Sequence, residues 1–453
     1  MRKCTKIKSQ YLYKAVYDLC FQANTCLNSE VYTDLKLIEK SNLDSREKMY
    51  KIFTNNSIAN LNKRPLCQDT GQIVTFFEIG ENVFLDQSNP TEIINKAISD
   101  CYNENYFRKS IVKNALFDRT NTNNNIPSIV YIDYIKGDDI KINILIKGGG
   151  AENMSDVKMF SPSATEQEIF DYVLNVVSNA GENACPPLFL GIGVGGTMDY
   201  ACVLSKKAFF AKDNTEFTQR LKNYINEKTK TKVANIQMLC SSTHIASLPV
   251  AVTVNCHSAR HAGAIVNEQG YKITTKFISE TLNDKITLNE KEILVTDINK
   301  LKKTKQGENI LLSGTIYTAR DAAHKKLVEM INKKEKLPFD LKNSIIFYAG
   351  PCPKNNNEII GPVGPTTSKR MDKFAPILYE NGVLATIGKG ERSTEVKQSL
   401  KNNSALYFSI QGGIASLLQN CIKSAEIIAF EELGAEAIYK LQVEKLPIKL
   451  ELK

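Results

Sequence analysis

The segments Ser344–Ala349 (SIIFYA), Gly382–Ile387 (GVLATI) and Ala405–Ile410 (ALYFSI) decide the fold class of this chain. Each is a short apolar run of the length typical of a buried strand. Helical patterns precede them at Asp321–Lys333 and Thr366–Glu380. Because strands that alternate with helices build α/β layers, we predict an α/β domain of about 160 residues here. The same pattern continues with a predicted helix at Thr394–Lys401 and a predicted strand at Ala425–Phe430.

The preceding part of the chain mixes helices and strands. Ile129–Ile135 and Ile140–Ile146 are predicted strands on either side of a Lys-Gly-Asp-Asp turn. Apolar residues recur at helical spacing from Ile169 to Ala180, and the glycine that follows is a typical helix stop. The polar stretch Asn283–Asn309 is a predicted linker that includes one short strand at Glu292–Val295. We therefore predict an α/β protein of two domains, residues 1–285 and 286–453.

Composition excludes several classes of protein. Apolar residues make up 42% and charged residues 24% of the 453, which is ordinary for a globular chain and not for a disordered one. No apolar run approaches the roughly 18 residues of a membrane-spanning helix, and the N-terminus shows no signal sequence. We expect a cytoplasmic protein with no membrane partner. The net charge of +9 comes from lysines scattered along the chain without interleaved aromatic residues, so we expect no nucleic-acid partner.

The eleven cysteines include no Cys-x-x-Cys pair, which argues against both a disulfide framework and a zinc ribbon. Cys67, Cys185 and Cys256 differ from most of the others because they lie in polar, turn-prone segments. Three separated thiolates can bind three irons of a four-iron cluster and leave the fourth iron open to substrate as a Lewis acid. From the residues alone, zinc remains an alternative.

Three of the four histidines also lie near one another in the sequence. His244, His257 and His261 lie within one short stretch that also contains Cys256 and Arg260. A single histidine is most often a hydrogen-bonded structural residue, but titratable groups that cluster beside cysteine and arginine are typical of functional sites.

The chain contains glycine-rich segments of two kinds. Gly191–Gly196 satisfies the G-x-G-x-x-G pattern of dinucleotide-binding proteins, with Asp213 near the expected acidic position. The strand before it is very short, so we favour a glycine turn packed close to a ligand or to another backbone segment. Lys147–Asn153 and Gly361–Arg370, by contrast, place backbone N–H groups beside cations and indicate anion binding. Together with the Lys389 turn and the arginines at positions 119, 260 and 320, they indicate a substrate with two carboxylates.

These motifs resemble those of the class I, iron–sulfur-dependent fumarate hydratases and the related tartrate dehydratases. The resemblance extends from about residue 11 to residue 448. The motifs that carry it are Cys67–Gly71 (CQDTG), Lys147–Ser155 (KGGGAENMS), Cys185–Pro187 (CPP), Thr243–Val254 (THIASLPVAVTV), Cys256–His261 (CHSARH), Ser313–His324 (SGTIYTARDAAH), Gly361–Met371 (GPVGPTTSKRM) and Gly388–Gly390 (GKG).

The resemblance implies that Cys67, Cys185 and Cys256 hold a [4Fe–4S] cluster whose fourth iron binds the substrate hydroxyl and a carboxylate. It implies an N-terminal α/β cluster domain and a smaller C-terminal domain with a swivelling β/α core, with the active site between them. The chain would then be the fused form of a two-subunit enzyme, and it would work as a homodimer.

The resemblance also implies roles for individual residues in the reversible hydration of fumarate to L-malate. Thr366 would be the base, and Asp69 paired with His244 would move protons on the other side of the substrate. The residues expected to bind the dicarboxylate are Gln68, Arg119, Gly150, Arg320, Arg370 and Lys389. Ala151 departs from the family, which often has serine there, and Met198–Tyr200 also differs from the usual family sequence. L-tartrate and mesaconate remain alternative substrates, and an iron-sensing nucleic-acid-binding protein is the alternative from another class.

Overall fold

The computed structural model describes residues 4–41, 43–86, 89–211, 215–279 and 290–453, and forms two compact units, Met1–Thr281 and Leu282–Lys453. The predicted α/β class and its division into two domains are confirmed. The predicted boundary between residues 285 and 286 lies outside the described residues, as do the first part of the predicted linker and Asp213. Within the described residues no helix is long and apolar enough to cross a membrane.

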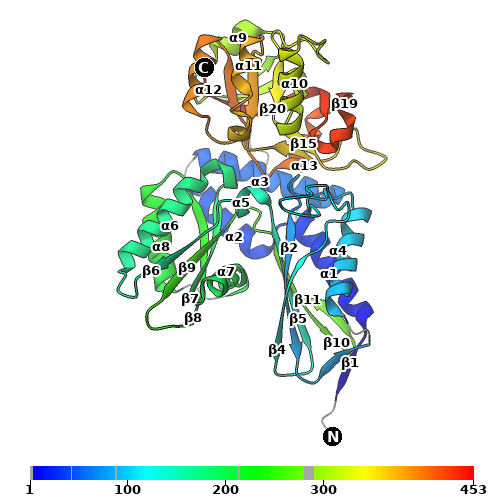
Figure 1. Cartoon of the computed structure of the whole chain (residues 1–453), viewed down its shortest axis with the longest axis vertical. Coiled ribbons are helices and arrows are strands. Elements are labelled where there is room, and N and C mark those ends of the chain that lie inside the picture. The colour runs from blue at the N-terminus through cyan, green and yellow to red at the C-terminus, as the bar shows by residue number, and fades with distance from the viewer. Residues whose placement is uncertain (1–3, 42, 87–88, 212–214, 280–289) are drawn as a thin grey trace. The chain divides into compact units, whose positions relative to one another are not determined.

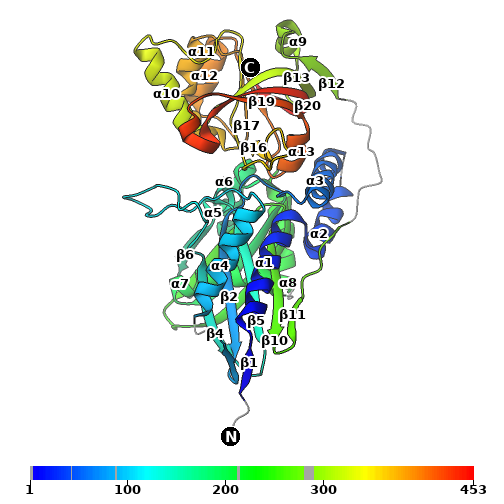
Figure 2. The ribbon, with the colours of Figure 1, turned by 90° about the vertical axis from the view of Figure 1, so that its right-hand side faces the viewer.

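The N-terminal unit contains two larger sheets (Figures 1 and 2) and a small two-stranded sheet of β1 and β3. One has five strands in the order β11-β10-β5-β2-β4, and the other has four in the order β6-β9-β7-β8. The elements of this unit are β1 (Thr5–Ile7), α1 (Ser9–Thr25), α2 (Ser29–Glu39), α3 (Leu43–Asn62), β2 (Gln72–Gly80), β3 (Val83–Leu85), α4 (Pro90–Glu104), β4 (Ile129–Ile135), β5 (Ile140–Lys147), α5 (Gly149–Glu152), β6 (Asp156–Phe160), α6 (Glu166–Ala180), η1 (Gly181–Ala184), β7 (Leu188–Gly196), α7 (Met198–Lys207), η2 (Ala208–Phe210), α8 (Glu216–Lys228), β8 (Val233–Thr243), β9 (Leu248–Asn255), β10 (His261–Asn267) and β11 (Gly270–Ile273).

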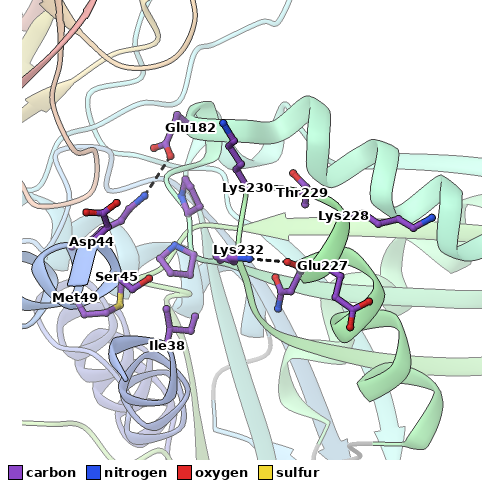
Figure 3. Close-up of a pocket in the computed structure, with 14 residues that line it drawn as sticks. Ile38, Asp44, Ser45, Met49, Glu182, Glu227, Lys228, Thr229, Lys230 and Lys232 are labelled. Carbon is purple, nitrogen blue, oxygen red and sulfur yellow. Dashed lines mark hydrogen bonds and ion pairs between the residues drawn. The ribbon is translucent and has the colours of Figure 1, made fainter. Parts of the chain in front are cut away.

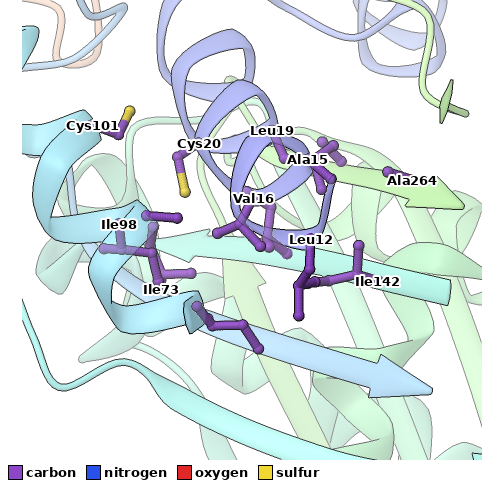
Figure 4. Packing of buried hydrophobic residues seen from close by; sticks show 14 of the residues in the cluster. Leu12, Ala15, Val16, Leu19, Cys20, Ile73, Ile98, Cys101, Ile142 and Ala264 are labelled. Atoms are coloured by element: carbon purple, nitrogen blue, oxygen red, sulfur yellow. The ribbon is translucent and has the colours of Figure 1, made fainter. Parts of the chain in front are cut away.

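Helix α1 packs its apolar face on the five-stranded sheet (Figure 4). Leu12, Val16 and Leu19 recur at helical spacing and are fully buried. They belong to the same cluster as Ile142 of β5 and Ile73 of β2. Burying apolar side chains of this size contributes about 1.5–3 kcal/mol each, so this cluster is a main source of stability for the sheet.

The predicted strands at Ile129–Ile135 and Ile140–Ile146 are confirmed as β4 and β5. They are not hydrogen-bonded to each other. Strand β2 lies between them, parallel to β4 and antiparallel to β5. A local turn therefore joins two strands that are separated in the sheet, and only the tertiary pairing decides this order.

The glycine pattern at Gly191–Gly196 is part of strand β7, so the interpretation as a glycine turn or a dinucleotide loop is wrong. The expected close approach of another backbone segment is confirmed. A Cβ atom on Gly191 would lie 2.0 Å from the carbonyl oxygen of Ser205, and one on Gly193 would lie 2.0 Å from that of Ala201. Both carbonyls belong to α7, so the absence of side chains on this face of β7 lets α7 pack directly against the strand.

Helix α7 and the segment after it contact both sheets of the N-terminal unit. Lys207 forms ion pairs with Glu78 of β2 and Asp133 of β4, at 3.2 and 2.9 Å. The ring of Phe210 packs edge-on against Phe76 of β2. Close packing on β7 and ion pairs to β2 and β4 therefore hold the two sheets together.

The C-terminal unit contains a seven-stranded sheet in the order β12-β13-β14-β17-β18-β20-β19, in which β13 also pairs with β20, and a two-stranded sheet of β15 and β16. Strands β13, β14, β17 and β18 are parallel, and β20 is antiparallel to both β13 and β18, so these five strands close into a ring. The elements are β12 (Lys291–Leu294), α9 (Ile298–Lys303), β13 (Asn309–Thr318), α10 (Asp321–Asn332), β14 (Ile345–Phe347), β15 (Ala349–Pro351), β16 (Val363–Pro365), η3 (Ser368–Met371), α11 (Ala375–Glu380), β17 (Ala385–Gly388), α12 (Thr394–Asn402), β18 (Leu406–Ser409), α13 (Ala415–Asn420), β19 (Ile422–Ala429), η4 (Glu431–Glu436) and β20 (Ile438–Leu452).

The strands and helices predicted in this unit are confirmed except for a continuous helix over Thr366–Glu380. That stretch forms only the short turn η3 and the helix α11. Its first residues are held in an extended conformation because the amide of Thr366 donates to the carbonyl of Tyr348 and Thr367 forms a bridge with Lys389. Pro376 lacks an amide proton and so favours a new helix start near its own position.

The glycine face of β7 leads to a stability prediction. In Gly193→Ala the added methyl group would collide with the backbone of α7, and we expect the free energy of unfolding to fall by about 1–3 kcal/mol. Denaturant unfolding of the full chain measures this. Ile192→Val, on the opposite face of the same strand, is the control and should lose about 1 kcal/mol. A Gly193→Ala variant as stable as the native chain would contradict the packing described here.

Candidate active site

Cys67, Cys185 and Cys256 come together in the N-terminal unit from three separate loops. Cys67 lies before β2, Cys185 lies before β7, and Cys256 follows β9. Burial raises the pKa of the Cys67 thiol to about 12, the guanidinium of Arg260 opposes this rise, and the charges of Asp69, Cys256 and Cys185 add to it. Because the charges of Cys185 and Cys256 affect the pKa of Cys67, the three thiols lie in one neighbourhood.

Hydrogen bonds hold two of these loops together. The backbone amide and the ring Nδ1 of His257 lie 3.2 and 3.1 Å from the carbonyl oxygen of Cys185. Cys185 itself has a φ angle of 57° and Ala259 one of 32°, conformations that L-residues rarely adopt. Backbone strain of this kind costs of order 1–3 kcal/mol per residue and is typical of functional sites. The role of His257 is therefore to join the Cys185 and Cys256 loops, which the sequence alone did not indicate.

The residues alone left a four-iron cluster and a zinc ion as alternatives for these three cysteines. Within the described residues, no three or more His, Cys, Asp or Glu side chains are grouped so that they could hold a metal ion. All eleven cysteines are free of disulfides. Three separate thiolates can each bind a different iron of a four-iron cluster.

The Asp69 carboxylate lies at the centre of a network of donors. Its Oδ2 accepts a 2.8 Å hydrogen bond from the amide of Gly149, and its Oδ1 accepts one of 3.2 Å from the amide of Gly71. The guanidinium of Arg108 lies 3.7 Å from Oδ1. The amide of Asp69 donates to the sulfur of Cys67 at 3.4 Å. Asp69 thus connects the thiol site, the glycine loop and an arginine.

The arginine of this network is Arg108, whereas the resemblance implied a substrate-binding role for Arg119. Arg119 is exposed on the loop between α4 and β4, and its Nη1 donates to the carbonyl of Ala115. Arg108 is mostly buried, with 18% of its side chain exposed, and lies beside Asp69. In the sequence, Arg108 directly follows Phe107, which is fully buried in the structure. Both arginines lie in similar polar segments, so the local sequence does not show which one is near the site.

Gln68 is the chain neighbour of Asp69, and Gly150 adjoins the glycine that contacts it. The Cys67 thiol donates to Oε1 of Gln68 at 3.4 Å, and Gln68 is buried. Gly150 is the second residue of α5, next to the Gly149 amide that binds Asp69. His244 is exposed on the loop between β8 and β9, where its Nδ1 accepts a hydrogen bond from the amide of Ala246. The pairing of His244 with Asp69 therefore stays a prediction.

A buried lysine joins the two sheets next to this site. Lys147 ends β5 with only 3% of its side chain exposed, and its Nζ donates to Oδ1 of Asn255 at 2.8 Å and to the carbonyl of Val254. Burial lowers the pKa of Lys147 to about 8, although Glu152, 3.4 Å away, opposes this. Because Asn255 ends β9 and precedes Cys256, this lysine fixes the strand that leads into one of the three thiols.

In the C-terminal unit, Arg370 lies between an acid and a hydroxyl. Its Nε and Nη2 contact the two carboxylate oxygens of Asp321 at 2.9 and 2.7 Å. Its Nη1 donates to Oγ1 of Thr366 at 3.2 Å. Half of the Arg370 side chain is exposed. A cation next to Thr366 would stabilise negative charge on that oxygen.

Two further predicted cations lie in the same unit. The Arg320 guanidinium forms an ion pair of 3.1 Å with Glu436 and has 13% of its side chain exposed. Lys389 follows β17, and its carbonyl accepts a hydrogen bond from the amide of Ser368. The structure therefore brings Thr366, Arg370 and Lys389 onto two adjoining segments.

The N-terminal unit also contains a cavity of about 550 Å³ (Figure 3). Glu182, Lys230 and Lys232 line it, together with Pro186 and Pro187. None of the predicted catalytic or substrate-binding residues lines this cavity.

The two parts of the chain match two family descriptions. Residues 13–265 match fumarate hydratase (Fumerase), and residues 264–452 match the fumarase C-terminus. The chain belongs to the class I fumarate hydratase family, as the resemblance predicted, and the prediction that it is an enzyme of the hydro-lyase class is confirmed.

Relatives extend over almost the whole chain. The aerobic class I fumarate hydratase of Escherichia coli K12 is 28% identical over 96% of this chain and 86% of its own length. Fumarate hydratase 1, mitochondrial, of Leishmania major is 26% identical over 94% of this chain and 87% of its own. A putative L(+)-tartrate dehydratase subunit beta of Methanocaldococcus jannaschii is 41% identical over 32% of this chain and 76% of its own.

His324 leads to a prediction about pH. This fully buried histidine contacts the carbonyl of Arg320 through Nδ1 at 2.8 Å, and burial lowers its pKa from 6.5 to about 4. Between these values the unfolded chain binds a proton that the folded chain does not, so stability falls as the pH is lowered from 6.5 to 4. We expect the unfolding free energy of the native chain to fall by up to about 1.4 kcal/mol per pH unit more than that of His324→Asn. Parallel pH profiles for the two proteins would contradict this.

Proposed function

We propose that this chain catalyses the reversible hydration of fumarate to L-malate, and that Cys67, Cys185 and Cys256 hold a [4Fe–4S] cluster for that reaction. The observation that carries the proposal is the gathering of these three thiols beside Arg260 and Asp69. Fumarate hydratases that align with nearly the full chain support the choice of reaction.

Removal of the hydroxyl group from malate is difficult because hydroxide leaves poorly and the neighbouring C–H bond is weakly acidic. When bound, a cluster with one iron left without a protein ligand supplies a Lewis acid for the departing hydroxyl group. The protein must then bind two carboxylates, hold the substrate in one orientation and move a proton.

In the N-terminal unit we assign carboxylate binding to Arg108, with Gln68 and Gly150 nearby. Arg108 takes the place of Arg119 because it lies within the Asp69 network. We assign proton transfer to Asp69, together with His244. The amides of Gly71 and Gly149 hold the Asp69 carboxylate in one position, which proton transfer requires.

In the C-terminal unit we assign the base to Thr366 and carboxylate binding to Arg320, Arg370 and Lys389. The contact of 3.2 Å between Arg370 and Thr366 supports this, because the guanidinium stabilises the oxyanion that a threonine base requires. Asp321 holds the Nε edge of Arg370 and Thr366 accepts from Nη1, so only the guanidinium N–H groups that contact neither residue stay available for a substrate carboxylate.

L-tartrate is the second candidate substrate, since the C-terminal part aligns with a putative tartrate dehydratase subunit at 41% identity. Mesaconate is the third candidate substrate, and an iron-sensing role with nucleic-acid binding is the candidate from a different class of function.

We keep two further predictions, that the protein is a homodimer and that it is cytoplasmic. Light scattering of the purified protein tests the first.

The decisive experiment is anaerobic purification and reconstitution with iron and sulfide, followed by parallel assays with malate, tartrate and mesaconate. We expect a brown protein with about four irons per chain that prefers malate. Air should abolish the activity, and iron with thiol should restore it. A brown protein that acts on none of the three substrates and binds nucleic acid would contradict the proposal.

The assignment of Arg108 leads to a matched pair of variants. We expect Arg108→Met to lower kcat/KM for malate at least about a hundredfold, as loss of a charged substrate contact does. Arg119→Met should change it less than about twofold, because that side chain is exposed and bonded only locally. Steady-state kinetics of the reconstituted proteins measure both. The reverse order of effects would restore Arg119 to the site.

A further inference from the structure

Two segments of the C-terminal unit carry residues assigned to the reaction. Thr366 and Arg370 lie at the ends of one segment, and Lys389 lies on the other, directly after β17. The two segments already share a backbone contact, because the amide of Ser368 donates to the carbonyl of Lys389 at 2.8 Å. The regular elements at these two segments, η3 and β17, are only four residues long, so other residues must hold this contact in place.

Tyr407 of β18 reaches both segments. Its hydroxyl donates to the carbonyl of Gly390 at 2.7 Å and lies 2.9 Å from the hydroxyl of Ser368. The Tyr407 hydroxyl is the donor toward both oxygens, so its single proton is shared between the Gly390 carbonyl and the Ser368 hydroxyl. Tyr407 has 1% of its surface exposed and Ser368 has none, so water does not compete for these bonds.

The surroundings of Tyr407 hold its ring independently of the hydroxyl. The buried guanidinium of Arg392 lies 4.9 Å from the ring centroid and is paired with Asp372 at 2.7 Å. Burial raises the pKa of Tyr407, so its hydroxyl stays protonated at neutral pH. A Cβ atom on Gly388 would lie 2.0 Å from the Ser368 hydroxyl, so only glycine allows the two segments to approach this closely.

We propose that Tyr407 is a positioning residue, whose hydroxyl fixes the Thr366–Arg370 segment against the Gly388–Gly390 segment so that Thr366, Arg370 and Lys389 keep their relative positions. Tyr407 acts through Ser368 and Gly390. This inference rests on the proposed function only for its effect on the reaction. The link between the two segments stands on the geometry alone.

The test compares two buried tyrosines of the same network in the full reconstituted chain. Tyr407→Phe removes the hydroxyl that joins the segments. Tyr379→Phe removes a hydroxyl that is similarly buried but lies 2.6 Å from Thr386 within β17. We expect Tyr407→Phe to lower kcat for malate at least about tenfold, because small displacements of reacting groups are costly. Tyr379→Phe should stay within about twofold of the native rate at a similar loss of melting temperature.

Hydrogen exchange of the Ser368 amide supplies a readout that does not depend on activity. We expect this amide to exchange faster in Tyr407→Phe and at the native rate in Tyr379→Phe. Ser368→Ala should lower kcat less than Tyr407→Phe does. The double variant should lose no more kcat than Tyr407→Phe alone, because both substitutions act on the same link between the segments.

Equal exchange and equal kcat in the two phenylalanine variants would overturn the positioning role. If the native chain does not act on fumarate or malate, the proposed function fails, and the exchange of Ser368 then decides the positioning role by itself.

Discussion

The carboxylate of Asp69 is the interaction on which the N-terminal site depends. It accepts from the amides of Gly71 and Gly149 and lies beside Arg108, while its own amide donates to Cys67. A carboxylate surrounded by donors is held far more firmly than a neutral side chain would be, because charge-assisted hydrogen bonds are the strong ones. The thiol loop, the glycine loop and the arginine segment therefore take their positions from one side chain.

Each unit also buries cations that have no direct part in the proposed reaction. Lys147 is held by Glu152 and Asn255, and Arg392 is held by Asp372. An unpaired buried charge would cost several kcal/mol, so these partners are required for the fold. These pairs also fix the orientation of the buried cation relative to its neighbours. Lys147 orients the strand before Cys256, and Arg392 packs against the ring of Tyr407.

The elements that could be predicted from the sequence are those whose apolar period is strong. The helix that ends at Gly181 and the strands β4, β5, β14, β17 and β18 follow from local pattern alone. The predicted helix over Thr366–Glu380 failed because hydrogen bonds from Tyr348 and Lys389, remote in sequence, hold its first residues extended. The glycines of β7 were interpreted as a turn because a strand without side chains on one face has no apolar alternation.

The sequence by itself determined the two-domain α/β class and the family, and it indicated three cysteines in polar, turn-prone segments, because these depend on residue types and spacing. Only the tertiary structure decided that Arg108 and not Arg119 lies beside Asp69, that His257 joins two of the thiol loops, and that Tyr407 links the segments of Thr366 and Lys389. These are contacts between residues distant in the chain. Their existence depends on how sheets pair and close, which no local pattern specifies.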